Sequence, residues 1–416
     1  MAHLLSLIEK VPLHGDTVCV VGIYADYPTY KPVEAKGEGF ACVDDAARAA
    51  VLFIRYNEVF QKDENEPVIN GLVKFLLNMQ TENGLFYNFL EKRDGRVVIN
   101  TDGRTSAAGF GWWAARAVWA LGEAADYFKG RNEKTYDEIK NAVGKSLPQI
   151  DSLAKNYGKL DKTGNPTWLL YGDGADATSE LVLGLNEIYK TTGNSIYSSL
   201  VKKLCEGMIV LQRGSCDVGP YGVLASNGGG WHGWANSQAT AILQYSRLTR
   251  DTSMIRNALR EVNCFLPRWA GALFFRSCNM QGSDLNYSGQ IAYDVRPAVT
   301  AATEAYEITH DQKYKTLACI LSSWFFGNNT SKTDFYSEET GICFDGTIDS
   351  IGVNKNSGAE STVEALLTMV ELHKIDANFD SIVLVSPPSF NANEYTYSVD
   401  GKELKIRMTA DGFRVN

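Results

Sequence analysis

Six stretches of the chain show the same change of pattern, from a cluster of small and polar residues to the spacing of an amphipathic helix. They begin at residues 41–50, 106–113, 175–180, 231–238, 293–298 and 357–363. Successive beginnings lie about 60 to 70 residues apart, a spacing that suits one helical hairpin followed by a loop. The pattern therefore predicts a helical repeat that runs through most of the chain.

Apolar side chains follow helical periodicity within these stretches. In the first stretch, small or apolar residues occupy positions 46, 49, 50 and 53, the i, i+3, i+4 and i+7 positions of one helix face. The same spacing recurs in the third and the sixth stretch. The abundant Ala and Gly allow neighbouring helices to approach closely, as an inner ring of helices requires.

A second, more polar helix is expected after five of these inner helices. The expected second helices are residues 68–80, 135–153, 196–212, 252–267 and 312–326. The connections at 191–194 and 249–252 are short enough for αα-hairpins. The sixth inner helix has no such partner after it, and residues 3–11, which also read as a helix, are expected to close the ring in its place.

These features together predict an all-α fold, an (α/α)6 toroid of six helical hairpins, as a catalytic domain over residues 1–376. An open α-solenoid with a protein-binding groove is the alternative. Beyond residue 376 the pattern changes, because 381–385 reads as a strand and 395–408 reads as a β-hairpin around Asp400 and Gly401. Residues 377–416 are therefore expected to form a short β segment, or the start of a truncated β module.

Acidic residues gather where the inner helices begin. Long loops join each outer helix to the next inner helix, so one face of the ring receives both these loops and the helix beginnings. The candidate catalytic residues at this face are Asp44, Asp45, Asp102, Asp176, Asp294 and Glu360. Carboxyl groups held close together raise one another's pKa, as a general acid at neutral pH requires. Each of them also has a simpler interpretation, because Asp is a favoured N-cap residue and a negative charge is stabilised in a first helical turn.

The loop around residues 228–236 combines three glycines with two tryptophans, which would let flat indole rings reach a sugar. With other side chains at the same face, it gives the candidate substrate-binding residues Tyr171, Asp173, Trp231, His232, Trp234, Asn236, Tyr293 and Arg296. The alternative is a glycine-rich loop anchored by buried tryptophans. Hydrolysis of a glycosidic bond needs one carboxylic acid to protonate the leaving oxygen and a second carboxylate to activate water or attack the sugar.

Composition excludes several other functions. The 416-residue chain carries a net charge of −9 and has no evident Lys/Arg cluster, so nucleic acid is not an expected partner. Its longest apolar runs are far shorter than the ~20 residues of a membrane span. Residues 3–9 read as a helix and not as a secretory leader. The location is therefore cytoplasmic, or extracytoplasmic if a leader has been removed, and no pattern assigns an oligomeric state.

The eight cysteines are scattered and include no CxxC pair. Cys42, Cys205, Cys264 and Cys319 fall within or at the start of helical patterns, where a free thiol behaves as a small apolar group. Neither Cys nor His occurs at the spacing of zinc ligands, so no metal site is expected. The carboxylate chemistry described above needs no organic cofactor.

Two short motifs resemble the six-hairpin glycosidase superfamily of (α/α)6 toroids. Residues 44–48 have the Asp-Asp-x-Ala-Arg start of helices in toroidal domains of carbohydrate-active proteins, and residues 356–364 are similar to the last inner helix of such proteins. The resemblance extends over about residues 1 to 376. It implies a toroid that acts on carbohydrate, and it assigns no individual hydrolase family.

Other toroidal enzymes can be tested against the same residues. A sugar 2-epimerase of this fold relies on several cavity histidines, whereas His232 is the one histidine of five expected at this face. The sequence around Asp44 and Asp45 supplies neither acidic motif of terpene cyclases. Toroidal lyases use a Tyr or His base beside Arg or Asn, and that interpretation stays open on Tyr293, His232, Arg296 and Asn236. A glycoside hydrolase is therefore the leading hypothesis, with a lyase acting on a uronate-containing glycan and a non-catalytic glycan-binding toroid as alternatives.

Overall fold

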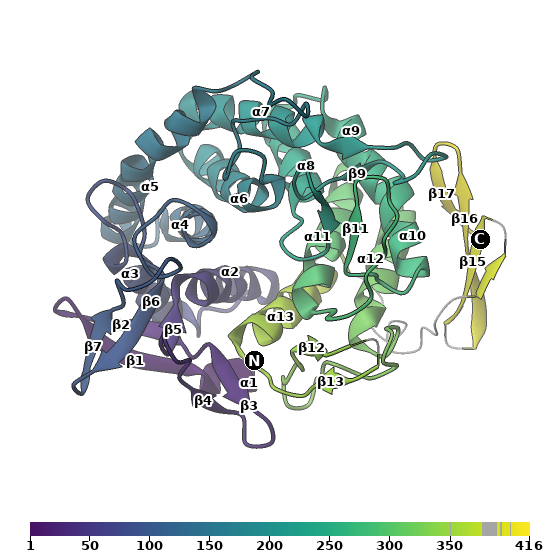
Figure 1. The fold of residues 1–416 in the computed structure, drawn as a ribbon. Helices are drawn as coiled ribbons and strands as arrows, with labels where there is room; N and C mark the ends of the chain where they lie inside the picture. The colour runs from purple at the N-terminus through teal and green to yellow at the C-terminus, as the bar shows by residue number, and fades with distance from the viewer. Residues whose placement is uncertain (350, 377–388, 392, 400) are drawn as a thin grey trace.

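A closed ring of helices forms the centre of the molecule (Figure 1). The computed structural model describes residues 1–349, 351–376, 389–391, 393–399 and 401–416. Within this part of the chain the inner helices are α2 (Val43–Phe60), α4 (Trp112–Phe128), α6 (Ala175–Thr192), α8 (Gln238–Thr249), α11 (Ala292–Thr309) and α13 (Ala359–Lys374). Each packs against the next in this order, and α13 returns to α2. The six predicted inner helices are thereby confirmed.

Small residues allow the inner helices to pack this closely. A Cβ atom added at Gly122 in α4 would lie 2.4 Å from the carbonyl oxygen of Gly184 in α6. One added at Gly184 would lie 2.4 Å from the carbonyl oxygen of Val118. Any larger side chain at either glycine would force the two backbones apart, which explains why the inner helices are rich in Gly and Ala.

A second layer of helices surrounds this ring (Figure 1). Its members are α3 (Glu66–Asn78), α5 (Glu133–Ala154), α7 (Ser195–Val210), α9 (Ile255–Arg260), α10 (Leu266–Gly271) and α12 (Lys313–Ser322). The outer helix expected over 252–267 is divided, because the π-helix η1 (Glu261–Phe265) separates α9 from α10. Pro267 follows at the second residue of α10, and because α10 continues directly from η1, the proline supplies no N–H for a helical hydrogen bond at this junction. A short 3-10 turn, η2 (Ser323–Phe325), ends the last outer helix.

The prediction of a helix over residues 3–11 is wrong beyond its first turns. Helix α1 (Ala2–Ser6) is short, and the chain then forms the hairpin β1 (Ile8–Leu13) and β2 (Asp16–Val21). His14 and Gly15 form its turn with φ of 49° and 89°, the left-handed values that a tight hairpin turn requires. The hairpin packs against α3, while α1 contacts α13. The ring is therefore completed beside α13 by one short helix and not by a full hairpin.

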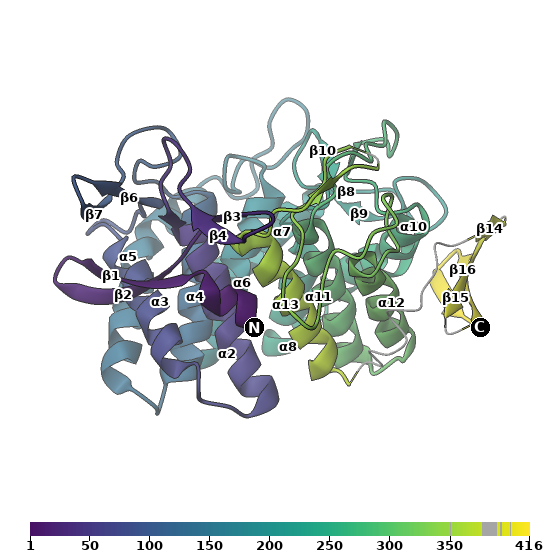
Figure 2. The ribbon, with the colours of Figure 1, turned by 90° about the horizontal axis from the view of Figure 1, so that it is seen from below.

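Short strands and long loops gather at the end of the ring where the inner helices begin, as Figure 2 shows for β3, β4, β6 and β10. The short strands of the chain are β3 (Tyr24–Asp26), β4 (Lys31–Val33), β5 (Ala41–Cys42), β6 (Phe89–Arg93), β7 (Arg96–Ile99), β8 (Gln212–Arg213), β9 (Val223–Leu224), β10 (Gly230–His232), β11 (Ser277–Asn279), β12 (Gly346–Thr347) and β13 (Val353–Asn354). This arrangement confirms the expected separation of long loops and short turns onto opposite ends.

The last part of the chain forms an antiparallel sheet beside the outer layer (Figure 1). Its strands are β14 (Ser389–Asn391), β15 (Glu394–Val399), β16 (Lys402–Thr409) and β17 (Gly412–Val415), paired in that order. The hairpin of β15 and β16 is the one predicted from the sequence, whereas the strand expected at 381–385 lies outside the described residues. The Tyr395 ring rests on α10 at Gly271, where a Cβ atom would lie 2.3 Å from it.

Cys216 and Cys264 form a disulfide bond with their Cα atoms 4.8 Å apart. The expectation that Cys264 is a free apolar thiol is therefore wrong. Nothing in the sequence pointed to the pair, because 48 residues separate its members. Cys42 and Cys205 are free and buried, as expected. Among the helices of the described residues, none has the length and apolar character that would take it across a membrane.

Candidate active site at the mouth of the ring

A cavity of about 340 Å³ opens where the inner helices begin. We call it the mouth cavity. Its charged lining residues are Glu38, Asp44, Asp45, Asp345 and Glu360, together with Arg48 and Arg116. Five carboxyl groups against two guanidinium groups give the cavity a negative balance, which suits a neutral or positively charged ligand better than an anion. Of the predicted catalytic residues, Asp44, Asp45 and Glu360 come together here.

Asp44 occupies the first turn of α2 and reaches the cavity from that side. Its Oδ1 atom lies 2.6 Å from Nη1 of Arg116 in α4, and the Asn88 amide donates a weaker hydrogen bond of 3.5 Å to Oδ2. The Asp44 side chain is 19% exposed. A charged carboxylate is thus held in a fixed position while part of it remains open to a ligand.

Asp45 is buried and acts mainly on its neighbours. Its Oδ1 atom accepts a 2.6 Å hydrogen bond from Nη2 of Arg48, and the Cys42 thiol donates to Oδ2. Burial raises the pKa of Asp45, while Arg48 opposes this change. The other nitrogen of Arg48 lies 2.9 Å from Glu360 and 3.4 Å from buried Glu364. Asp45 therefore orients Arg48, which in turn holds Glu360, whose side chain is 43% exposed.

Asp345 is a cavity residue that the sequence analysis missed. It lies in the loop before β12, and its Oδ1 atom accepts hydrogen bonds from the Ser361 hydroxyl (2.7 Å) and the Gly358 amide (3.1 Å). Burial raises the pKa of Asp345, the hydrogen bonds from Ser361 and Gly358 oppose this change, and the charge of Glu360 adds a smaller increase. A raised pKa favours the protonated acid. No helix start precedes Asp345, so the pattern that identified the other acids did not apply to it.

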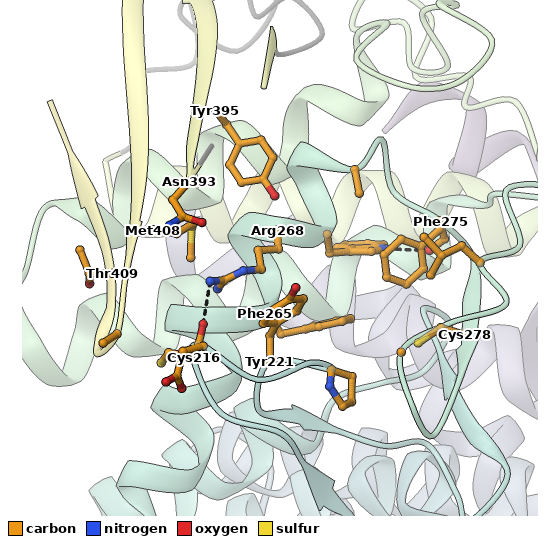
Figure 3. A pocket seen from close by; sticks show the side chains of 17 residues that line it. Cys216, Tyr221, Phe265, Arg268, Phe275, Cys278, Asn393, Tyr395, Met408 and Thr409 are labelled. Atoms are coloured by element: carbon orange, nitrogen blue, oxygen red, sulfur yellow. Dashed lines mark hydrogen bonds between the residues drawn. The ribbon is translucent and has the colours of Figure 1, made fainter. Parts of the chain in front are cut away.

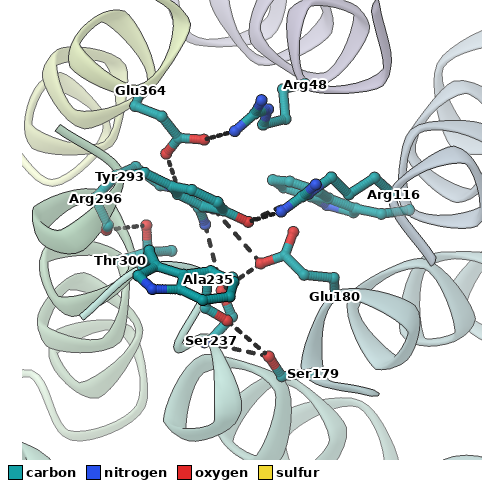
Figure 4. Close-up of polar contacts among 12 residues, drawn as sticks. Arg48, Arg116, Ser179, Glu180, Ala235, Ser237, Tyr293, Arg296, Thr300 and Glu364 are labelled. Carbon is teal, nitrogen blue, oxygen red and sulfur yellow. Dashed lines mark hydrogen bonds and ion pairs between the residues drawn. The ribbon is translucent and has the colours of Figure 1, made fainter. Parts of the chain in front are cut away.

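A network of buried charges joins the inner helices and includes Arg48 and Arg116 of the mouth cavity (Figure 4). The Tyr293 hydroxyl accepts a 2.8 Å hydrogen bond from Arg116, and the Arg48 guanidinium lies 4.9 Å from the centre of the Tyr293 ring. Arg296 pairs with Glu364 at 2.7 Å and with Glu180 at 3.6 Å. Tyr293 and Arg296 are both buried. Partners on neighbouring helices enclose both side chains in this structure, and a role for them in substrate binding stays a prediction.

His232 and Trp234 lie at the same end of the ring, beside the start of α4. Nε2 of His232 is 3.0 Å from Oδ2 of Asp176, and Nδ1 is 3.1 Å from the carbonyl oxygen of Trp234. The two rings stack with centroids 3.9 Å apart. Because both ring nitrogens face oxygen acceptors, full hydrogen bonding requires a proton on each nitrogen or a protonated Asp176. Trp234 also contacts Trp112, over which the Arg116 guanidinium lies.

Trp231 and Asn236, from the same loop, do not face a ligand. Trp231 is buried and makes edge-to-face contacts with Phe265, Trp269 and Phe275. In this structure it is a core residue of the adjacent wall, and a role in stacking on a sugar stays a prediction. The Asn236 side chain accepts a hydrogen bond from Ser226 and another from Gln238, so its role in the structure is to fix the loop.

Asp102 and Asp294 lie apart from the cavity lining. The Asp102 side chain is 81% exposed and pairs with Arg93 on the outer surface. Asp294 is buried and caps α11 by accepting a hydrogen bond from the Ile291 amide. Burial raises the pKa of Asp294 to about 7, against the opposing effect of that hydrogen bond. Neither side chain is part of the cavity lining, and a direct catalytic role for either residue stays a prediction.

Tyr171 and Asp173 lie in the loop that precedes α6. The Tyr171 side chain is 62% exposed, and its hydroxyl accepts a 3.1 Å hydrogen bond from the Trp112 amide at the start of α4. Asp173 accepts a hydrogen bond from the Gly228 amide and thereby holds the glycine-rich loop. Within the described residues no group of acidic, His and Cys side chains has an arrangement that could hold a metal ion.

Comparisons with known proteins identify the fold. No known protein family matches the sequence, and no curated protein matches it. A solved D-mannose isomerase superposes with a TM-score of 0.59 at 12% identity, covering 90% of this chain and 95% of that chain. A sugar epimerase from a ruminal bacterium gives 0.57 at 12% identity, covering 86% and 92%. The endoglucanase J30 of glycoside hydrolase family 9 gives 0.53 at 14% identity, covering 88% and 78%. The chain therefore has the helical toroid fold found in six-hairpin glycosidases, as its two motifs indicated.

Proposed function

We propose that this protein is a glycoside hydrolase and that the mouth cavity is its active site. The observation that carries the proposal is that Asp44, Asp345 and Glu360, from three separate segments, all line one cavity of about 340 Å³. Cleavage of a glycosidic bond by the usual mechanism needs two carboxyl groups in different protonation states on either side of that bond.

The surroundings of these residues suggest which roles they take. Asp345 suits the general acid, because burial raises its pKa against the opposing hydrogen bonds from Ser361 and Gly358, and a raised pKa favours the protonated form. Asp44, ion-paired with Arg116, suits the carboxylate that activates water or attacks the sugar. Glu360, held by Arg48, keeps a negative charge close to Asp345.

The same charges favour a neutral sugar or an amino sugar as substrate. A uronate would bring another carboxylate into a cavity already lined by five carboxyl groups. Trp234 and the exposed Tyr171 offer aromatic rings near the entrance, and such rings pack well against the apolar face of a sugar. The lyase alternative is less well supported, because burial raises the pKa of Tyr293 and a tyrosine base requires the opposite change.

A sugar isomerase or epimerase is the second candidate. This candidate is favoured by the contact between His232 and Asp176, because a histidine held by a carboxylate suits the transfer of a proton at a sugar carbon. The fold neighbours include proteins named as a D-mannose isomerase and a sugar epimerase. Against it, both nitrogens of His232 are engaged by Asp176 and Trp234, so the ring would have to exchange a partner during turnover.

The nature of the products tests these candidates. The protein would be incubated with a panel of neutral oligosaccharides in deuterated water and compared with the Asp44→Asn variant. Hydrolysis produces new reducing ends without the ultraviolet absorbance of a conjugated double bond, whereas isomerisation changes the sugar and introduces solvent deuterium without new reducing ends. New reducing ends that are lost in Asp44→Asn support the proposal. Deuterium exchange without cleavage, an ultraviolet-absorbing product or binding without turnover would each overturn it.

A further inference from the structure

A second and larger cavity, of about 590 Å³, lies between the outer wall of the ring and the C-terminal sheet (Figure 3). We call it the side cavity. Its aromatic lining residues are Tyr221, Phe265, Trp269, Phe275 and Tyr395. None of the residues that line it also lines the mouth cavity. A volume of this size with a mainly apolar lining and a few polar groups is typical of a ligand site.

Arg268 brings a positive charge that forms no ion pair within the described residues into this cavity (Figure 3). Its Nη1 and Nη2 atoms donate 2.6 Å hydrogen bonds to the carbonyl oxygens of Cys264 and Cys216, and its guanidinium lies 4.2 Å from the centre of the Tyr221 ring. In the part of the chain that the structure describes, no carboxylate pairs with it. Asp217, the acidic residue of the lining, bonds to Ser215, and its charge still raises the pKa of Arg268, so it balances part of the arginine's charge without an ion pair. Burial accordingly lowers the pKa of Arg268, a cost that a bound anion would reduce.

The walls of the side cavity are held in place before any ligand binds. The disulfide of Cys216 and Cys264 ties the loop of residues 214–222 to η1. Gly282 packs so closely on Pro220 that a Cβ atom there would lie 2.8 Å from the proline ring. Such walls lose little conformational freedom on binding, which favours affinity.

The polar groups of the side cavity are spread around the arginine. Asn393 and Thr409, from the C-terminal sheet, line the cavity opposite the helices. Their amide and hydroxyl groups suit a ligand with several hydroxyl groups better than a simple aromatic acid. The Tyr221 side chain is 37% exposed and offers a ring edge and face to an apolar surface.

We propose that the side cavity is a non-catalytic carbohydrate site that binds a sugar residue carrying a carboxylate. Arg268 takes the carboxylate, the ring packs against Tyr221, and Asn393 and Thr409 bind hydroxyl groups. The identification of the ligand as a carbohydrate rests on the proposed function. In this proposal the mouth cavity cleaves the polymer at a neutral or amino sugar, and the side cavity binds the same polymer through an acidic sugar.

Calorimetric titration of the full chain tests this proposal directly. The ligands would be an oligouronate and the same oligosaccharide after reduction of its carboxyl groups to alcohols. Arg268→Gln is compared with the control Arg256→Gln, which removes an exposed arginine from nearby α9. The oligouronate should bind the wild-type protein and the control about tenfold more tightly than the reduced form, as expected for a charge-assisted hydrogen bond. Arg268→Gln should abolish that preference. Equal binding of both ligands by the wild type, or a preference that survives in Arg268→Gln, overturns the proposal.

A second variant separates binding from structural damage, because Arg268 also supports two backbone carbonyls. Tyr221→Ala leaves both of those hydrogen bonds in place. It should weaken the binding of both oligosaccharides by a similar, several-fold factor. Unchanged binding in this variant contradicts the assigned position of the sugar ring. These titrations do not depend on turnover. Arg268-dependent binding without any hydrolysis would overturn the proposed function alone, and hydrolysis without Arg268-dependent binding would overturn this inference alone.

Discussion

The mouth cavity and the side cavity differ in how their charges are balanced. At the mouth, Arg48 and Arg116 each contact carboxylates from other parts of the chain, and a second tier of ion pairs lies beneath them. In the side cavity, Arg268 donates to two carbonyl oxygens and lies over an aromatic ring, and the charge of Asp217 acts on it without forming an ion pair. The comparison shows that a site with excess carboxyl groups selects against anions, whereas an isolated arginine in an apolar wall attracts them.

The largest effect expected at the mouth is the loss of the proposed proton donor. Asp345→Asn keeps an oxygen that can accept from Ser361 and Gly358 but provides no acid. We expect kcat to fall by about 10²- to 10⁴-fold, the usual contribution of general acid catalysis, with a small change in KM. Steady-state kinetics on the oligosaccharide found by the product assay would measure this. Asp137→Asn, an exposed position on α5, is the control, and undiminished kcat in Asp345→Asn would remove Asp345 from the mechanism.

The contrast between the two arginine environments predicts a difference in stability. Arg296→Met leaves Glu180 buried without its cation and Glu364 with the more distant Arg48 alone, so we expect the free energy of unfolding to fall by about 3–5 kcal/mol. Arg268→Met breaks no ion pair with a carboxylate and should cost less, about 1–3 kcal/mol for two hydrogen bonds. Urea unfolding followed by circular dichroism would compare the two. Equal decreases in the free energy of unfolding would mean that the ion pairs of Arg296 contribute little to stability.

The sequence predicted the mouth better than the side cavity, for a physical reason. Asp44 and Glu360 are adjacent to helix beginnings, and a closed ring brings all such beginnings to one end. Asp345 lies in a loop, and the loop path depends on contacts distant in sequence. The side cavity needs residues from 216–285 and 393–410 to meet, and neither their periodicity nor their composition indicates that the C-terminal sheet docks against α10.

The two arginines of the mouth cavity can also be predicted from their positions in the inner helices. Arg48 follows Asp45 by three residues, and Arg116 occupies the second turn of α4. Residues three or four positions apart lie on the same face of a helix, so a side chain one turn after an acid at the start of an inner helix lies next to that acid. Ring position therefore predicts both the acids and the cations that balance them, once the closed ring is assumed.

The burial of Asp294 predicts a pH dependence of the free energy of unfolding. Its pKa is about 7 in the folded protein and 3.8 in the unfolded reference, so the folded state binds the extra proton between these values. The stabilisation it provides is complete below the lower pKa and is lost as pH rises through the higher one, with a slope of at most about 1.4 kcal/mol per pH unit. Asp294→Asn should remove this dependence. Urea unfolding of both proteins at several pH values across that window would measure this. If the free energies of unfolding of the wild type and the variant change in parallel with pH, Asp294 does not titrate as described.

The smallest expected effect comes from two tryptophans three residues apart. Trp231 lies in β10 opposite Cys278 of β11 and points into an aromatic cluster, whereas Trp234 lies beyond the strand and stacks on His232 near the entrance. Trp234→Ala should raise KM by about three- to tenfold, the range of an aromatic contact of 0.5–1.5 kcal/mol, and leave stability nearly unchanged. Trp231→Ala serves as the matched control, because it should lower stability while KM in the surviving folded protein stays the same. If the two variants exchanged these phenotypes, Trp231 would be the residue that meets the sugar, and the entrance of the mouth would have to be reassigned to the other side of the loop.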